Sequence, residues 1–156
     1  VGTNENAFLS TIKSRCMILH FEEINEEEIL RYLEEIYQIK INSPIMIKAF
    51  QGSIGKAIEL KDKQEQYEKI ENLIYGLEKM DVVDLVNRAE FLYSNKDDKT
   101  EILDYMEVIL MEIAKESNKY AQTIEIVEQT KKRLFANANY DMNIDNMLFK
   151  IWETVN

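Results

Sequence analysis

The 156-residue chain contains few of the residue types that build several common classes of protein. Its single cysteine excludes an internal disulfide and a zinc site made of cysteines, and its single histidine argues against a histidine-rich metal site or a histidine-driven triad. Four glycines and one proline argue against an all-β protein, which needs many tight turns. No apolar run approaches the roughly 20 residues of a membrane-spanning helix. We therefore expect neither a metal site nor a membrane segment.

The charge is strongly acidic, with 29 acidic residues against 19 basic ones and a net charge of −10. Binding of nucleic acid over the whole surface is disfavoured, because phosphate contacts need lysine and arginine. Hydrophobic residues make up 46% and charged residues 31%, a mixture typical of a folded domain with a core. The composition predicts a helical interaction protein in the cytoplasm that does not itself bind DNA tightly.

Helix signals begin after an acidic stretch. Asn25 precedes three glutamates, as a helix N-cap followed by an acidic first turn would, and the apolar spacing predicts a helix from about 26 to 38. Ser43 with the following proline is a second helix start, which Gly52 ends. Ser53 can cap a third helix.

The chain then becomes strongly polar over residues 61–71, where we place a domain boundary or a helical linker. Beyond it, apolar residues repeat at helical spacing and predict five antiparallel helices over residues 64–156. The predicted organisation has three parts: 1–21, 22–62 and 63–156.

Residues 15–21 form a short apolar run that is the best strand candidate. Cys16 in such a strand is interpreted as a small core residue, and His20 as a structural or exposed strand residue. Arg15 stands where a polar segment meets the predicted strand. A guanidinium there suits planar recognition of phosphate or carboxylate, although its position alone also fits a surface salt bridge.

The segment Leu9-Ser10-Thr11-Ile12-Lys13-Ser14-Arg15-Cys16 resembles the Ser-Arg-Cys motif of the clamp-loader subunits of the AAA+ family. Ser10 stands where the family usually has proline. In the family this arginine is an arginine finger that reaches the ATP of a neighbouring subunit. The resemblance implies that role for Arg15, supported by Ser14 and Cys16.

Two further segments resemble the same family, in the same order. The sequence from Ala49 to Leu60 is similar to the second-sensor region of the helical lid, with Gly52, Ser53, Gly55 and Lys56 at the motif positions. Subunits that hydrolyse ATP carry an arginine two residues after the serine, where this chain has Gly55 followed by Lys56. The pattern resembles the delta-prime type of bacterial DNA polymerase III clamp-loader subunit, which does not hydrolyse ATP.

The third segment, residues 132–148, is similar to the collar segment that turns on an Asn-x-Asn pair, and Arg133, Asn137 and Asn139 carry this likeness. No phosphate loop occurs in the sequence. The resemblance implies a mainly α fold: a three-helix AAA+ lid followed by a five-helix collar that assembles the complex. Residues 1–21 would be the end, with a strand remnant, of a nucleotide-binding domain that precedes residue 1.

The function implied is that of a non-hydrolysing subunit of the replicative clamp loader. It would assemble with gamma/tau and delta subunits, supply Arg15 in trans, and act on the sliding clamp and primed DNA only through the whole complex. The chain would have no cofactor and no activity of its own. ATP and magnesium would be bound by its neighbours, and the complex belongs to the DNA polymerase III holoenzyme, a DNA-directed DNA polymerase.

Two alternatives stay open: a gamma/tau-type ATPase subunit, against which Gly55 argues, and a helical adaptor unrelated to replication. A helical enzyme that uses paired carboxylates is a weaker third.

Some residues have more than one interpretation. The basic run from Lys131 to Arg133 fits a solvated helix face or a salt bridge to another subunit. The aromatic residues Tyr105, Phe135, Phe149 and Trp152 fit helix packing, with a share of them facing neighbouring subunits.

Overall fold

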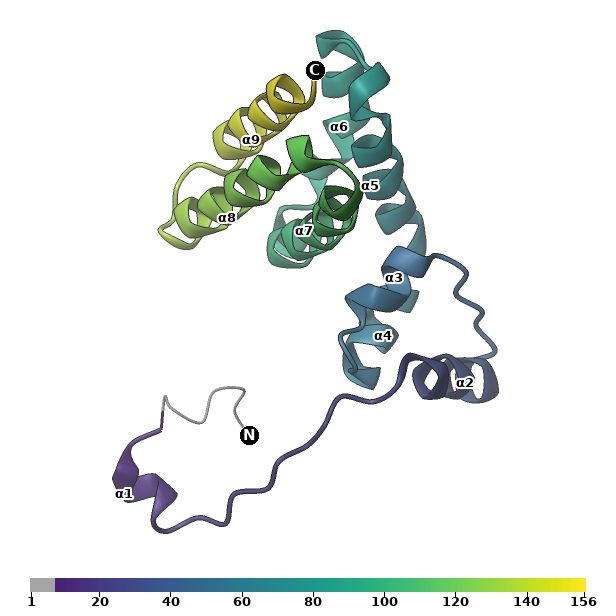
Figure 1. Cartoon of the computed structure of the whole chain (residues 1–156), viewed down its shortest axis with the longest axis vertical. Coiled ribbons are helices and arrows are strands. Elements are labelled where there is room, and N and C mark those ends of the chain that lie inside the picture. Colours follow the sequence, from purple (N-terminus) through teal and green to yellow (C-terminus); the bar gives the residue numbers. More distant parts are fainter. Residues whose placement is uncertain (1–7) are drawn as a thin grey trace.

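The computed structural model describes residues 8–156, which form α-helices and short 3-10 turns and contain no β-strand. None of these helices is long and apolar enough to cross a membrane. Figure 1 shows α5 to α9 gathered in one group, α2 to α4 below them, and α1 apart at the end of an extended segment. The α-helices are α1 (Ser10–Lys13), α2 (Glu26–Tyr37), α3 (Pro44–Ala49), α4 (Ile54–Lys61), α5 (Gln64–Gly76), α6 (Val82–Ser94), α7 (Lys99–Glu116), α8 (Ala121–Phe135) and α9 (Tyr140–Val155).

The helix starts predicted before residue 62 are confirmed by their caps. The Asn25 side chain accepts a hydrogen bond from the backbone N–H of Glu27 at 2.9 Å, at the start of α2. Ser43 caps α3 and Ser53 caps α4 in the same way. Each cap satisfies a backbone donor that the first helical turn leaves without a partner. Local chemistry thus sets where these three helices begin.

Helices α2, α3 and α4 share a small apolar core. Ile29 and Leu33 of α2 are fully buried, as are Phe50 just after α3 and Ala57 of α4. Their burial follows the spacing of apolar residues along each helix. The polar stretch after α4 is not one continuous helix, because the chain turns between Lys61 and Gln64 before α5 begins.

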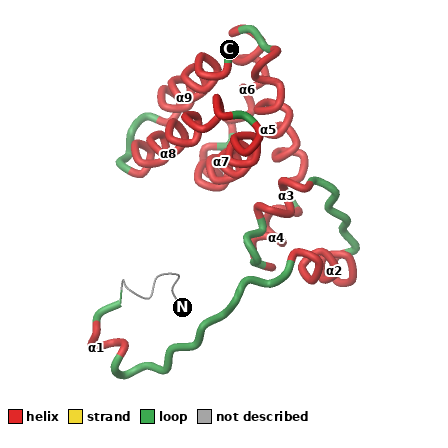
Figure 2. Tube along the Cα trace, viewed as in Figure 1, coloured by secondary structure: helices red, strands yellow, loops and turns green. Residues whose placement is uncertain are grey.

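Residues 64–156 contain five α-helices, α5 to α9, as predicted, together with the 3-10 turns η2 (Leu77–Lys79), η3 (Lys96–Asp98) and η4 (Asn118–Tyr120). Helix α7 contacts α5 and α8 and also α3. Its buried side chains include Tyr105, Met106, Ile109 and Leu110. Helix α7 therefore links the five-helix group to the three helices before it, and Figure 2 shows that both groups consist of helices joined by loops.

The end of α9 is held beside the connection between α5 and α6. The Trp152 indole N–H donates to the carbonyl of Met80 at 2.8 Å, and the Asn156 amide donates to the carbonyl of Leu77 at 3.1 Å. At the other end of α9, the Tyr140 hydroxyl donates to the carbonyl of Leu92 at 2.9 Å. Helices α6 and α9 therefore lie antiparallel.

The strand predicted over residues 15–21 is wrong. Residues 16–21 are extended but pair with no other strand among residues 8–156, and their side chains are exposed. Cys16 is exposed as well, so its assignment to a core is also wrong. An apolar run becomes a strand only when a neighbouring strand takes up its backbone donors and acceptors, and the described chain offers none.

Candidate functional site

Arg15 follows directly after the short helix α1. The Ser14 hydroxyl donates to the carbonyl of Thr11 at 3.2 Å, and the Arg15 N–H donates to the carbonyl of Ile12 at 3.0 Å. These bonds close the turn that presents Arg15. The Arg15 side chain is exposed, and no carboxylate within the described residues pairs with it. Within residues 8–156, therefore, Arg15 does not form the salt bridge that its position also allowed.

In the segment that resembles a second-sensor region, the local backbone explains why Gly52 and Ser53 stand where they do. Gly52 has a φ of +65°, in the left-handed region that glycine adopts most readily. A Cβ atom at Gly52 would lie 2.3 Å from the Cβ of Glu23, and the carbonyl of Gly52 accepts a hydrogen bond from the N–H of Ile24 at 3.0 Å. Ser53 caps α4 through the N–H of Lys56 at 3.3 Å. These two residues shape the turn between α3 and α4.

Gly55 and Lys56, the other two residues of this segment, do not shape the turn in this way. A Cβ atom at Gly55 would meet only the hydroxyl of Ser53 at 3.6 Å, an ordinary contact. The Lys56 ammonium hydrogen-bonds the side chain of Gln51 and is exposed. Lys56 is the one cationic residue between Ala49 and Leu60, and its ammonium is engaged by Gln51.

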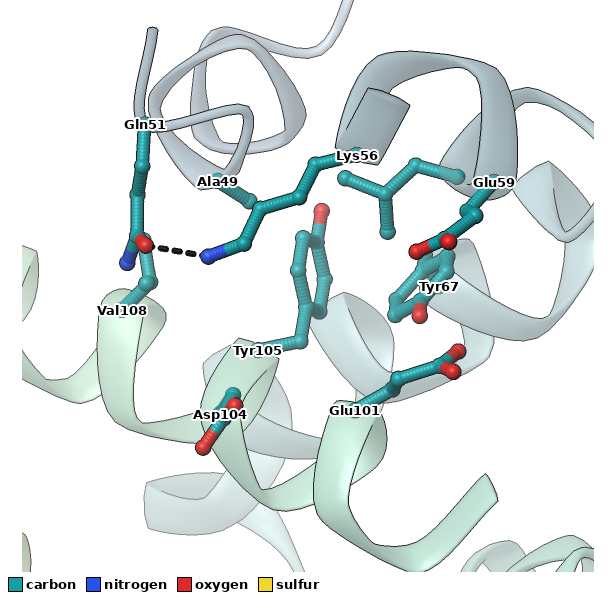
Figure 3. Close-up of a pocket in the computed structure, with 10 residues that line it drawn as sticks. Ala49, Gln51, Lys56, Glu59, Tyr67, Glu101, Asp104, Tyr105 and Val108 are labelled. Atoms are coloured by element: carbon teal, nitrogen blue, oxygen red, sulfur yellow. Dashed lines mark hydrogen bonds between the residues drawn. The ribbon is translucent and has the colours of Figure 1, made fainter. Parts of the chain in front are cut away.

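Lys56 lines a cavity of about 80 Å³ between α4 and α7. Figure 3 shows its side chain beside Tyr105, with Tyr67, Glu101 and Asp104 around it. The lining residues are Ala49, Gln51, Lys56, Glu59, Leu60, Tyr67, Glu101, Asp104, Tyr105 and Val108. The cavity is therefore built from the small three-helix unit on one side and from α5 and α7 on the other.

Two tyrosines form the buried wall of the cavity. The ring centroids of Tyr67 and Tyr105 lie 4.3 Å apart at an interplanar angle of 60°. The Tyr105 hydroxyl donates to the carboxylate of Glu71, which also accepts from the hydroxyl of Ser43 at 2.7 Å. Burial, and then the hydrogen bond to Glu71, raise the pKa of Tyr105 above its usual range. Glu71 thus joins the N-cap of α3 to α5 and α7.

Burial, and then the nearby charge of Glu101, raise the pKa of Tyr67 to about 12. Both phenols are therefore held neutral at ordinary pH, and neither is prepared to act as a base.

Two of the three acidic residues that line the cavity, Glu101 and Asp104, already have cationic partners. Glu101 pairs with Lys63 at 2.5 Å, and Asp104 pairs with Lys131 at 2.7 Å. Burial opposes a charge on Lys63, but its hydrogen bonds to Glu101 and Asp98 outweigh this and raise its pKa. Within residues 8–156 no three ligand-type side chains gather to hold a metal ion. The polar groups of the cavity mainly join helices to one another.

The Asn-x-Asn pair forms the connection between α8 and α9. Asn137 has a φ of +59°, and its N–H and that of Ala138 donate to the carbonyls of Leu134 and Arg133, both at 3.1 Å. This left-handed residue ends α8. Asn139 caps α9 by accepting from the N–H of Met142 at 3.0 Å. Both asparagines have a conformational role, which the short side chain of asparagine suits.

The three consecutive basic residues of α8, from Lys131 to Arg133, have different surroundings. Lys131 is partly buried and pairs with Asp104 and Glu107 of α7, so its salt bridge lies within the chain. Lys132 makes an exposed pair with Glu128 one turn earlier. The Arg133 side chain is exposed and has no carboxylate partner among the described residues.

The sequence-predicted residues fall in three separate places. Figure 1 shows α1, which precedes Arg15, far from α4, whose first turn carries Lys56. The α8–α9 connection with Asn137 lies apart from both. The structure therefore does not assemble these residues into one site.

Sequence reasoning missed the contacts that build the junction around the cavity. Glu71 and Lys63 lie in the polar stretch that was interpreted as a boundary, and Ser43 was recognised only as a cap. The one available signal was the placement of Glu71 and Tyr67 one helical turn apart in α5. Comparison of the chain with protein-family models, with curated proteins and with solved structures gave no match.

Proposed function

We propose that this chain is a non-hydrolysing clamp-loader subunit of the delta-prime type, which supplies Arg15 to the ATP site of a neighbouring gamma/tau subunit. The observation that carries the proposal is the exposed Arg15 of the Ser-Arg-Cys motif, whose side chain is paired with no carboxylate among the described residues. The chain has 29 acidic residues, and an exposed arginine that pairs with none of those in residues 8–156 is suited to contact a partner protein.

Arg15 would act on charge that develops during ATP hydrolysis. A planar guanidinium offers two parallel N–H groups to phosphate oxygens and stabilises the negative charge on the transferred γ-phosphoryl group. Arginine fingers of GTPases raise the rate by roughly 10³ to 10⁵. Nucleotide and magnesium would belong to the neighbouring subunit.

The rest of the chain supports an assembly role. It is a set of helices whose polar clusters tie the helices together, and residues 8–156 contain no group of three ligand-type side chains that could hold a metal ion. Gly55, at the position of the sensor arginine, has no side chain with which to touch a γ-phosphate. Lys56, its neighbour, is held by Gln51. These features favour the non-hydrolysing type over the gamma/tau type.

The test of the arginine finger is the DNA-stimulated ATPase of the assembled complex. Arg15→Ala should lower the rate by orders of magnitude and leave assembly intact, and Arg15→Lys should recover only part of it because lysine lacks the planar fork. Arg31→Ala, which removes an exposed arginine of α2, is the matched control. An unchanged ATPase rate in Arg15→Ala would refute the assignment.

Assembly is tested first and separately, by sedimentation velocity of this chain mixed with gamma/tau and delta subunits. A heavier species that contains the chain supports the clamp-loader proposal. Absence of any complex with these subunits would favour the helical adaptor instead. The chain alone should neither hydrolyse ATP nor bind DNA tightly, and tight, salt-sensitive DNA binding would contradict the proposal.

A further inference from the structure

Helices α2 to α4 form a unit that one short turn of the chain joins to the five-helix group. The turn comprises Asp62 and Lys63, between the end of α4 and the start of α5. Within the three-helix unit α4 contacts both α2 and α3, and Ile29 of α2, Met46 of α3 and Ala57 of α4 are buried. Close packing of this kind resists deformation inside the unit, so the unit can move as one body.

The two ends of the turn are fixed to different parts of the molecule. The Lys61 ammonium lies 5.1 Å from the centroid of the Tyr37 ring, at the end of α2. Lys63 instead bonds to Asp98 of the five-helix group at 2.9 Å. Asp62 lies between them, is 71% exposed, and pairs within residues 8–156 only with its neighbour Lys61. A change of backbone angles at Asp62 can therefore reorient the two parts while both of these contacts persist.

The surfaces that face each other across this junction are incompletely packed. They enclose the cavity of about 80 Å³, with Lys56 and Leu60 of α4 on one side and Tyr105 and Val108 of α7 on the other. Figure 3 shows Lys56 and Tyr105 facing each other across this space. Packed interiors leave few voids larger than a water molecule, and a void forfeits the contacts of the atoms that line it. These surfaces therefore separate at a lower cost than a fully packed interface.

Two polar contacts of α3 hold the junction closed. The Ser43 hydroxyl donates to the carboxylate of Glu71 at 2.7 Å, and the Lys48 ammonium pairs with Glu112 at 2.5 Å. Glu71 is held from its other side by the Tyr105 hydroxyl, which belongs to the five-helix group itself. The Lys48 and Glu112 side chains are 42% and 31% exposed, so salt screens their attraction. Both contacts depend on a charged group and can be broken by a change of charge.

We propose that these two contacts form a latch, and that the three-helix unit rotates away from α7 about Asp62 when the latch is released. In the open form the cavity joins the solvent. Glu71 keeps its bond to Tyr105, because both residues lie in the five-helix group. The charge facing Glu71 and the ionic strength set the balance between the two forms. This inference is independent of the clamp-loader proposal.

The test measures the distance between the two parts of the molecule with spin labels. Cys16→Ser removes the single cysteine, and Glu35→Cys in α2 with Gln122→Cys in α8 gives one exposed labelling site on each part. Double electron–electron resonance of this labelled chain should show one main distance, that of the closed form. A second distance that grows when the latch is weakened is the signature of the open form.

The Lys48 contact is tested by Lys48→Ala. This variant should raise the ratio of open to closed molecules about twofold to fivefold, the usual worth of an exposed ion pair. It should also reduce the effect of about 1 M salt on that ratio. Lys96→Ala is the matched control, because Lys96 pairs with Asp141 at 2.8 Å inside the five-helix group and is similarly exposed. Equal changes in the two variants would refute the role of Lys48.

Ser43→Asp is the decisive variant. Aspartate also caps a helix, so α3 keeps its start, but a carboxylate now faces Glu71 where a hydroxyl donated to it. The ratio of open to closed molecules should rise about tenfold or more, as the loss of a hydrogen bond to a charged group predicts. Ser53→Asp is the control, since within residues 8–156 the Ser53 hydroxyl bonds only the backbone of its own helix α4.

A second change distinguishes release of the latch from damage to α3. Glu71→Gln added to Ser43→Asp removes the repulsion and supplies an amide donor, so the double variant should return to the closed distance. Circular dichroism checks that each variant is folded. An unchanged distance in folded Ser43→Asp, an equal shift in Ser53→Asp, or a double variant that stays open would overturn the latch.

Discussion

The hydroxyl of Tyr105 in α7 donates a hydrogen bond to the carboxylate of Glu71 in α5, and Ser43 at the start of α3 donates to the same carboxylate oxygen. One acidic side chain thus holds three helices, two of the five-helix group and one of the three-helix unit. The salt bridge of Lys48 in α3 with Glu112 in α7, at 2.5 Å, adds a second tie across the same junction. Together these contacts position the cavity that Lys56 lines.

The Glu71 contact gives a first prediction. Tyr105→Phe removes the donor and keeps the ring packed against Tyr67, so it should lower the free energy of unfolding by about 1 kcal/mol, the net worth of such a bond. Tyr32→Phe is the control, since the Tyr32 hydroxyl makes no hydrogen bond within the described residues. Urea denaturation measures both. Equal losses in the two variants would show that the Glu71 bond does not stabilise the fold.

Gly52 and Gly55 should respond in opposite ways when each is replaced by alanine. Gly52→Ala forces a side chain into the left-handed region and against Glu23, and should destabilise the protein by about 1–3 kcal/mol. Gly55→Ala adds a Cβ that makes only an ordinary contact with the Ser53 hydroxyl in the first turn of α4, and should stabilise the protein by about 0.5–1 kcal/mol. Thermal unfolding distinguishes them. Two shifts of the same sign would contradict the structure of the α3–α4 turn.

The basic run of α8 offers a third matched pair. Lys131 pairs with two carboxylates of α7, and its loss leaves the partly buried Glu107 without its partner. Lys131→Ala should therefore cost about 1 kcal/mol or more of unfolding free energy. Lys132→Ala removes only an exposed pair within one helix, worth about 0.3–0.5 kcal/mol. Chemical denaturation of both variants should rank them in this order, and the reverse order would be inconsistent with the α7–α8 contact.

The buried tyrosines predict how stability changes at high pH. Burial raises the pKa of Tyr67 and of Tyr140 to about 12 in the folded chain, above the ordinary value of 10.0. Between these values the folded chain keeps protons that the unfolded chain has lost, so stability is complete below pH 10 and falls as the pH rises toward 12.

Denaturation at a series of alkaline pH values measures this loss. Tyr67→Phe and Tyr140→Phe should each make the dependence shallower, and the double variant more so. The ultraviolet absorbance of tyrosinate reports the ionisation itself. Ionisation of both residues near pH 10 in the folded protein would be evidence against the burial seen here.

The sequence was a good guide wherever structure depends on near neighbours. Asn25, Ser43 and Ser53 predicted three helix starts, because a cap needs only the backbone N–H groups of the next turn. Asn137 and Asn139 carry the likeness to a family motif. In the structure Asn137 ends α8 and Asn139 starts α9, and both roles depend only on backbone groups a few residues away. Helical spacing also predicted the five helices after residue 63.

The sequence failed where a partner from elsewhere decides the outcome. Residues 15–21 have the composition of a strand but find no strand to pair with among residues 8–156, and Cys16 is exposed for the same reason. Phe135 has the composition of a core residue, yet the register of α8 turns it outward. Glu71 lies in a polar stretch that gave no sign of Tyr105, which is 34 residues away.

What the sequence by itself determined is the helical class of the chain, the starts of α2, α3 and α4, the presence of five helices after residue 63, and the position of the arginine motif. Only the tertiary structure decided which helices meet, that Glu71 joins three of them, and which apolar residues stay uncovered. The physical reason is range: a cap or an apolar stripe is completed within a few residues. Burial and ion pairing depend on groups that are brought together only when the helices pack.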